Sequence, residues 1–451
     1  MEPHTAFRSI EDWERFETYV DLLWACGWRI LRLAFFWSAF EPTCDPKTPT
    51  YNEHYLKDYF HYLDLLASKG FLIIIDLHQD LLSANFGGNG MPEWVRSDST
   101  REHAIMRNTP LWGLNYVLNR HLRRTFTDFW SNDITNYHVD PPLTHFKVRD
   151  RYLDMVERVA EEAAKREQVF GIEIFNEPHP ATIEDRKFEE EILPKFYRGA
   201  TERIRKHSRY LFAFLAPQSD WNANVGREVQ ESYLRIDAED RRAVFAYHYY
   251  DSLLTGVGGK LFSDAKRDEY LAAQRDAVES AKQKGLTPFL TEFGTRQNWA
   301  RSIVRRHMDW QYEAVENALV SATYWNVNLY NTPESLDGFM REDFSLLGPD
   351  RVPRNLDVAC RPYVLAASAE PTHQHFNLRT KEYHLVLTGT PINEPTVIYL
   401  PTSQEHSLQP VHYTRFEIAY NGELRSELTG NELNVTLGAS LTHHDIVIRP
   451  R

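Results

Sequence analysis

Two glutamates occupy positions at which apolar segments of the sequence end. The stretch FGIEIFNEPHP stops at Asn176-Glu177-Pro178, and TPFLTEF carries Glu292 near its end. A capped strand end explains the first stretch taken alone, since Asn, Glu and Pro form turns and Pro178 cannot donate to a sheet ladder. Two opposed carboxyl groups, however, suit acetal hydrolysis: one is protonated and assists the leaving oxygen, while the other attacks the anomeric carbon.

Other polar and aromatic residues stand at the predicted ends of strands. In a parallel barrel these ends converge on one site. The set beside the two glutamates is Arg32 with Trp37 just beyond, His78, Asp80, Asn176, His248, Tyr250 and Trp325. Each has a structural explanation of its own, such as an ion pair, a buried histidine or simple packing. Their joint occurrence at successive strand ends favours a catalytic cleft.

Each member of this set has an expected task in such a cleft. Arg32 and Tyr250 would keep Glu292 ionised, and His248 would hold the acid side. Asn176 would bind the sugar 2-hydroxyl, and Trp325 would offer a flat face beneath the ring. A carboxyl separation of about 5–5.5 Å would mean retention of configuration.

A metal site is the alternative use of the same polar residues. His78, Asp80 and His248 are ligand types, but no tight ligand spacing supports a metal centre. We therefore expect neither metal nor cofactor.

The elements that must position these residues alternate between helix-like and strand-like patterns. A 3.6-residue period predicts helices, and short apolar runs without such a period predict the buried strands of a parallel sheet. The predicted strands are WRILRLAFF, FLIIIDLH, 169–175, 210–216, AVFAYHYY, TPFLTEF and ALVSATYW. The predicted helices cover residues 9–27, 55–69, 148–165, 185–206, 265–284 and 301–317.

This alternation is typical of an α/β fold, the (β/α)8 TIM barrel. Seven strand signals are present and the first of the eight is missing, so either that strand is very short or the given chain begins inside the barrel. We assign residues 1–362 to the catalytic barrel. A long insert at about 81–142 carries one predicted helix, WGLNYVLNRHLRRTFTDFW.

The composition changes after Pro362. Short alternating runs such as EYHLVLTG, PTVIYLP and HDIVIRP are separated by Gly, Pro and Asn, and YNGE is a hairpin signal. Residues 363–451 are therefore predicted to form a C-terminal antiparallel β-sandwich domain.

Composition excludes several classes of protein. With 42% hydrophobic and 25% charged residues the chain is globular, and its net charge of -13 argues against binding to nucleic acid. Three widely spaced cysteines, Cys26, Cys44 and Cys360, give no disulfide framework or zinc motif. The sequence has no apolar run long enough to span a membrane and no signal peptide at its start, so a cytoplasmic location is expected.

The order of these motifs resembles glycoside hydrolase family five over roughly residues 9–330. The resemblance implies a retaining double displacement, with Glu177 as acid/base and Glu292 as nucleophile. DLHQDLLSANFGGNGMPEW and LRRTFTDFW look like the endoglycoceramidase, glucosylceramidase and sterylglucosidase branches, whose members carry a C-terminal β-sandwich. By that likeness Asp80 would bind sugar hydroxyls, Tyr250 would contact the nucleophile, and the Leu, Trp and Phe side chains of residues 111–130 would cover a lipid aglycon. The alternative for these side chains is an amphipathic helix packed on the barrel.

The sequence thus predicts a retaining β-glycosidase that cleaves a β-glucosidic bond to a lipid such as ceramide or sterol. The expected partner is a glycolipid or glycoside, and peripheral contact with a membrane is compatible with this function. An endo-β-glucanase or mannanase is the alternative enzyme. A non-catalytic carbohydrate- or membrane-binding protein is the alternative class, although binding alone does not need two opposed carboxylates. The sequence does not indicate the oligomeric state.

Overall fold

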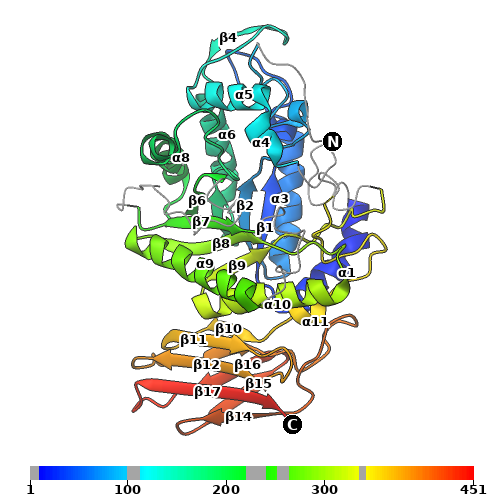
Figure 1. Ribbon diagram of the computed structural model, residues 1–451, viewed down its shortest axis with the longest axis vertical. Coiled ribbons are helices and arrows are strands. Elements are labelled where there is room, and N and C mark those ends of the chain that lie inside the picture. Colours follow the sequence, from blue (N-terminus) through cyan, green and yellow to red (C-terminus); the bar gives the residue numbers. More distant parts are fainter. Residues whose placement is uncertain (1–9, 99–111, 220–239, 251–263, 335–341) are drawn as a thin grey trace.

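The computed structural model describes residues 10–98, 112–219, 240–250, 264–334 and 342–451. Its central feature is a seven-stranded parallel sheet that curves into a near-barrel, with helices on its outer face (Figure 1). The strands follow the order β1 (Ile30–Phe35), β2 (Leu72–Leu77), β5 (Val169–Glu173), β6 (Phe212–Leu215), β7 (Ala243–Tyr249), β8 (Thr287–Phe293) and β9 (Ser321–Tyr324).

The predicted α/β barrel is confirmed, as are all seven predicted strands. The longer helices are α1 (Ile10–Ala25), α3 (Glu53–Ser68), α6 (Val148–Ala163), α8 (Leu193–His207), α9 (Asp264–Gln283) and α10 (Arg301–Ala318). Shorter pieces are α2 (Trp37–Phe40), η1 (Ala84–Phe86), α7 (Asp185–Lys187), η2 (Phe188–Ile192) and α11 (Leu356–Ala359). The helices form because one apolar stripe of each packs on the sheet.

The described residues contain no eighth strand between β9 and β1, where the first strand of a barrel would stand. These two strands are the ends of the sheet. A cavity of about 970 Å³ lies there, and residues of both strands line it. Because no neighbouring strand covers β1 on this side, Ile30 to Ala34 are only half-buried, whereas β2 is almost fully buried.

The insert after β2 differs from its prediction. The expected single helix is two, α4 (Leu114–Leu118) and α5 (Arg120–Trp130), followed by the hairpin of β3 (Ile134–Asn136) and β4 (Leu143–Phe146). The break falls at Asn119, whose side chain accepts hydrogen bonds from the backbone N–H groups of His121 and Leu122. This N-cap starts a new helix because it satisfies donors that would otherwise have no partner.

The C-terminal region is the predicted β-sandwich. One sheet has the order β10 (Tyr363–Ala366), β13 (Thr396–Tyr399), β16 (Glu432–Thr436), β15 (Arg425–Thr429). The other has β11 (Glu370–Phe376), β12 (Tyr383–Thr388), β17 (His443–Pro450), β14 (Phe416–Tyr420). Both sheets contribute buried side chains to one apolar core.

The hairpin predicted at YNGE is wrong. The strands on either side of it, β14 and β15, belong to different sheets. Asn421 donates from its side-chain amide to the carbonyl of His443 and accepts from the N–H of Asp445, so the turn is fastened to β17. The chain then crosses to the second sheet instead of folding back.

A buried arginine joins the barrel to the sandwich. Arg361 donates to Asp309 at 2.6 Å and to Glu316 at 2.7 Å, both on α10, and to the carbonyl of Phe376 on β11 at 2.9 Å. Burial raises the pKa of Glu316 to about 7 although Arg361 opposes the shift. The junction therefore depends on a charge that has no access to water.

We expect Arg361→Met to lower the free energy of unfolding by about 3–5 kcal/mol, because it leaves Glu316 buried without its cation. Urea unfolding followed by circular dichroism measures the loss. Arg449→Met, which removes an exposed arginine paired with Glu382, is the matched control and should change little. Equal midpoints for the two variants would contradict the assignment.

Candidate active site

The predicted site residues converge at the carboxyl ends of the strands. Arg32 lies on β1, His78 and Asp80 follow β2, Asn176 and Glu177 follow β5, His248 and Tyr250 end β7, Glu292 lies on β8, and Trp325 follows β9. Arg32, His78, Asp80 and Trp325 line one end of the 970 Å³ cavity. Trp37, by contrast, is buried at 2% exposure and its indole N–H donates to Glu41, so it belongs to the core.

The two glutamates face each other at short range. A carboxylate oxygen of Glu177, one of Glu292 and a ring nitrogen of His248 all lie within 4.8 Å of one another. Inverting glycosidases hold their carboxyl groups about 6.5–9.5 Å apart to admit a water molecule, and retaining ones about 5–5.5 Å apart. The spacing therefore fits direct attack by one carboxylate.

Donors hold both oxygens of Glu292. Arg32 Nη1 donates to Oε1 at 2.6 Å, and the hydroxyl of Tyr250 donates to Oε2 at 2.9 Å. Burial, together with the charge of Glu292, raises the pKa of Tyr250 above its ordinary value, so the phenol keeps the proton that it donates. One of the two donors is a charged guanidinium, and such charge-assisted bonds hold a carboxyl group firmly in position.

Arg32 is the centre of a larger buried network. It donates to Glu173 at 2.5 Å and to the side-chain oxygen of Asn176 at 2.8 Å, and it lies 3.0 Å from Asp76. Burial would raise the pKa of Glu173, but Arg32 and His248 outweigh it and lower that pKa to about 2. Sequence reasoning missed Glu173 and Asp76, although a carboxylate inside an apolar strand is itself a signal of a buried ion pair.

Glu177 stands in a strained turn. Its φ is 42°, in the left-handed region that non-glycine residues rarely adopt. The side chain of Gln79, a residue that sequence reasoning also missed, donates to the carbonyls of Asn176 and Glu177 at 2.9 and 3.1 Å and stabilises the turn. The glutamate side chain remains 18% exposed, and Oε1 bonds His248 Nδ1 at 2.8 Å.

His248 carries a positive charge between the two glutamates. Burial alone would lower its pKa, but Glu292, Glu173 and Glu177 raise it from 6.5 to about 10. Its Nδ1 lies 2.8 Å from Glu177 and its Nε2 lies 3.5 Å from Glu173. The ring nitrogens of His78 are likewise engaged, at 2.7 Å from Asp76 and 3.1 Å from Asp80.

An aromatic platform and a carboxyl group border the cleft. The indole of Trp325 stacks on His78 with ring centroids 5.4 Å apart. Burial raises the pKa of Asp80 to about 6 against the opposing effect of His78. Asn176 is 1% exposed, and its amide nitrogen donates to the carbonyl of Gln79, so one N–H remains for a ligand.

Three aromatic side chains of α5 do not face an open surface. Phe126, Phe129 and Trp130 are buried against the barrel, and Trp130 donates its indole N–H to the carbonyl of His179. The expectation that they cover a lipid is therefore wrong for these side chains. Their positions follow one face of α5, which is the packed face. Leu111 lies outside the described residues.

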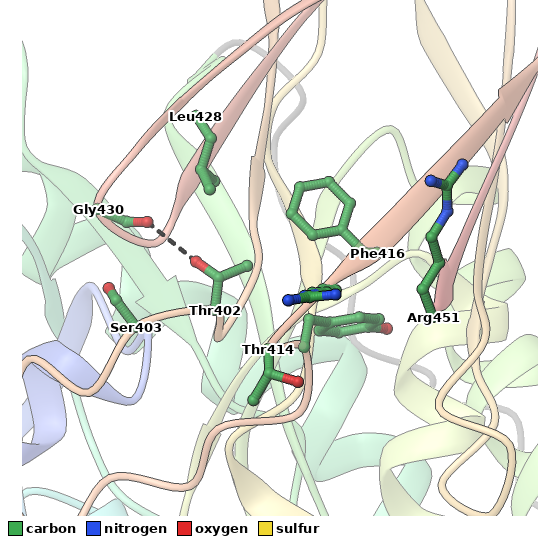
Figure 2. A pocket seen from close by; sticks show the side chains of 9 residues that line it. Thr402, Ser403, Thr414, Phe416, Leu428, Gly430 and Arg451 are labelled. Carbon is green, nitrogen blue, oxygen red and sulfur yellow. Dashed lines mark hydrogen bonds between the residues drawn. The ribbon is translucent and has the colours of Figure 1, made fainter.

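A second hollow, of about 560 Å³, lies on the sandwich (Figure 2). Figure 2 shows Phe416, Leu428 and Arg451 around it, with Thr402 donating to the carbonyl of Gly430. No carboxylate side chain or histidine is among its lining residues.

A comparison with known protein families identifies the family of this chain. The model of cellulase (glycosyl hydrolase family 5) matches residues 7–331. The chain belongs to glycoside hydrolase family 5, and it is a glycoside hydrolase. The family resemblance noted from the sequence is thereby confirmed.

Individual relatives are distant. Endoglycoceramidase I of Rhodococcus hoagii is 24% identical over 399 residues, covering 84% of this chain and 71% of the relative. Glucosylceramidase of Aspergillus fumigatus is 23% identical over 278 residues, which is 53% of this chain and 34% of that protein.

Two solved structures share the fold. Endo-glycoceramidase II from Rhodococcus sp. gives a TM-score of 0.73 at 21% identity, over 98% of this chain and 92% of that one. Sterylglucosidase 1 of Cryptococcus neoformans gives 0.76 at 14% identity, over 100% and 92%.

The raised pKa of His248 predicts a pH-dependent stability. The folded-state pKa of about 10 exceeds the ordinary value of 6.5. The contribution of His248 to the free energy of unfolding is therefore complete below pH 6.5 and is lost as the pH rises to about 10. The slope for one proton is at most about 1.4 kcal/mol per pH unit. His248→Gln should abolish this part of the slope in urea unfolding measured across that range. His54→Gln, at an exposed histidine, should retain it; an unchanged slope in His248→Gln would contradict the charge assignment.

Proposed function

We propose that the protein is a retaining β-glycosidase that hydrolyses the β-glucosidic bond between a sugar and a lipid aglycon. The observation that supports this most strongly is the asymmetric pair of glutamates within 4.8 Å. Glu292 is held by two donors, Arg32 and Tyr250, whereas Glu177 is more exposed and has one, His248. One carboxyl is thus prepared to attack and the other to exchange protons with substrate and water.

The reaction follows from these positions. A carboxylate oxygen of Glu292 forms a bond to the anomeric carbon while the bond to the aglycon oxygen breaks and Glu177 protonates that oxygen. Water then attacks the glycosyl-enzyme, Glu177 accepts its proton, and Glu292 leaves. Oε2 of Glu177 has no hydrogen-bond partner among the described residues and is the oxygen free to carry the proton.

The remaining residues would bind the sugar. Trp325 offers a stacking face and Asp80 a carboxyl group, and both line the cavity. Asn176, just after β5, provides an amide at the same end of the strands. No metal or cofactor has a part in these steps.

The lipid aglycon is supported by relatives rather than by catalytic residues. The similar proteins are named endoglycoceramidase, glucosylceramidase and sterylglucosidase, and endo-glycoceramidase II has been solved in complex with ganglioside GM3. An endo-β-glucanase or mannanase would use the same two glutamates, and the family name includes cellulase. Because glycolipids reside in membranes, this proposal also includes peripheral contact of the protein with a membrane.

Glu177→Gln and Glu292→Gln should each abolish turnover of a natural glycoside while leaving the circular dichroism spectrum of the folded protein unchanged. With an aryl glucoside whose leaving group needs no proton, Glu177→Gln should instead accumulate a glycosyl-enzyme. Mass spectrometry should find one hexosyl addition on the peptide that contains Glu292. Activity retained by Glu292→Gln, or a hexosyl group on another residue, would refute the mechanism.

A substrate panel tests the aglycon. We expect release of sugar from glucosylceramide or a sterylglucoside by the purified protein, and none from carboxymethylcellulose, with Glu292→Gln as the blank. The same panel includes lactosylceramide and an aryl β-glucoside. Release of a disaccharide from lactosylceramide would indicate endo-cleavage, whereas hydrolysis of the aryl β-glucoside alone would indicate a simple glucosidase. If only the polysaccharide is cut, the lipid assignment fails and the chemistry stands.

A further inference from the structure

Two adjacent apolar side chains on α4 face solvent. Val117 is 61% exposed and Leu118 is 55% exposed. Among the described residues they are the one pair of sequence neighbours in the set of exposed large hydrophobic side chains. Single exposed apolar residues need no explanation, but a contiguous pair on a short helix at the surface is a candidate contact site.

Basic residues follow directly. The segment RHLRR, residues 120–124, belongs to a chain of net charge -13, yet no Asp or Glu occurs from residue 112 to residue 127. Arg120 is exposed and forms no ion pair within the described residues. Arg124 pairs with Asp128. Arg120 is therefore an exposed cation without a paired carboxylate among the described residues, on an acidic protein.

The apolar pair and the arginines are held together. Arg123 donates to the carbonyl of Val117 on α4 and to the carbonyl of Ala181 in the loop after β5, and no carboxylate pairs with it among the described residues. α4 is thus fastened to α5 and to the loop that follows Glu177. We call Val117, Leu118, Arg120, Arg123 and Arg124 the α4–α5 rim.

The rim lies beside the catalytic site. Tyr116, the residue before Val117, accepts a hydrogen bond from the N–H of Leu81, and its ring stacks on His179 with centroids 4.7 Å apart. Leu81 follows Asp80, and His179 is two residues beyond Glu177. Figure 1 shows α4 and α5 at the end of the barrel that is remote from the C-terminal sandwich.

We propose that the α4–α5 rim docks the enzyme on a lipid bilayer that contains anionic lipids, with the catalytic mouth toward the membrane. This inference rests on the proposed function, since a glycolipid presents its sugar at the bilayer surface. Apolar side chains that enter the interface and basic ones that meet anionic headgroups are the two signals that together give stable peripheral binding. Charge complementarity selects this partner, because a neutral surface would gain nothing from Arg120 and Arg123, whose charges no carboxylate among the described residues pairs with.

Vesicle sedimentation of the full chain tests the docking without any turnover. The probes are phosphatidylcholine vesicles with and without phosphatidylserine. We expect the parent protein to bind the anionic vesicles. Arg120→Gln should bind them about fivefold more weakly, which corresponds to a loss of about 1 kcal/mol for one basic residue. The double variant Val117→Asp with Leu118→Asp should weaken it at least about tenfold. Ile392→Asp and Arg415→Gln, at exposed positions of the sandwich, are the matched controls and should bind as the parent does.

Activity separates this inference from the proposed function. The rim variants should hydrolyse a soluble aryl β-glucoside as the parent does, but should lose hydrolysis of glucosylceramide in anionic vesicles in proportion to binding. Hydrolysis of detergent-dispersed glucosylceramide without vesicle binding would refute the docking and leave the function intact. Vesicle binding with no hydrolysis of any glycoside would refute the function and leave the docking intact.

Three further results would overturn the proposal. They are equal binding of parent and rim variants, equal binding to neutral and anionic vesicles, and release by inorganic phosphate at an ionic strength at which chloride has no effect. The last result would identify an anion pocket in place of a bilayer-binding surface.

Discussion

The active site depends on one buried guanidinium. Arg32 on β1 contacts carboxylates that come from three other strands, Asp76 on β2, Glu173 on β5 and Glu292 on β8. Three carboxylates this close, with almost no access to water, repel one another and cannot all remain ionised without a cation among them. The same contacts fix the relative positions of the four strands. The cation that pairs with Glu292 therefore also links the strands at the barrel end where Glu292 lies.

The two glutamates differ because their backbones and neighbours differ. Glu292 lies within β8, next to a shift in the register with β7, and its side chain meets Arg32 and Tyr250. Glu177 lies beyond its strand, in a left-handed conformation that Gln79 stabilises through two carbonyls. That turn explains why Asn176-Glu177-Pro178 interrupts an apolar run. Because the strand ends there, the side chain of Glu177 reaches the cleft and stays 18% exposed to solvent.

Sequence patterns predicted the elements and the residues at their ends, since apolar periodicity follows directly from burial in the sheet. They did not predict Glu173, Asp76 or Gln79, whose roles depend on partners from other strands. The prediction of a hairpin at YNGE was also wrong. The same turn residues allow the chain to cross to the other sheet when hydrogen bonds join Asn421 to β17. Whether such a turn closes a hairpin depends on pairing between distant segments, and the local composition of the turn does not reveal that pairing.

The insert shows how one helix can serve the core and the surface at different positions. Phe126, Phe129 and Trp130 occupy the face of α5 that packs on the barrel, so burial there removes them from any contact with substrate. Apolar contact outside the protein then falls to side chains that the fold leaves uncovered, Val117 and Leu118, on the far side of the Asn119 break. Had the segment been one continuous helix, as its periodicity suggests, α4 would share the axis of α5. The N-cap at Asn119 instead lets α4 take its own direction, with Tyr116 toward the catalytic loops and the next two residues toward solvent.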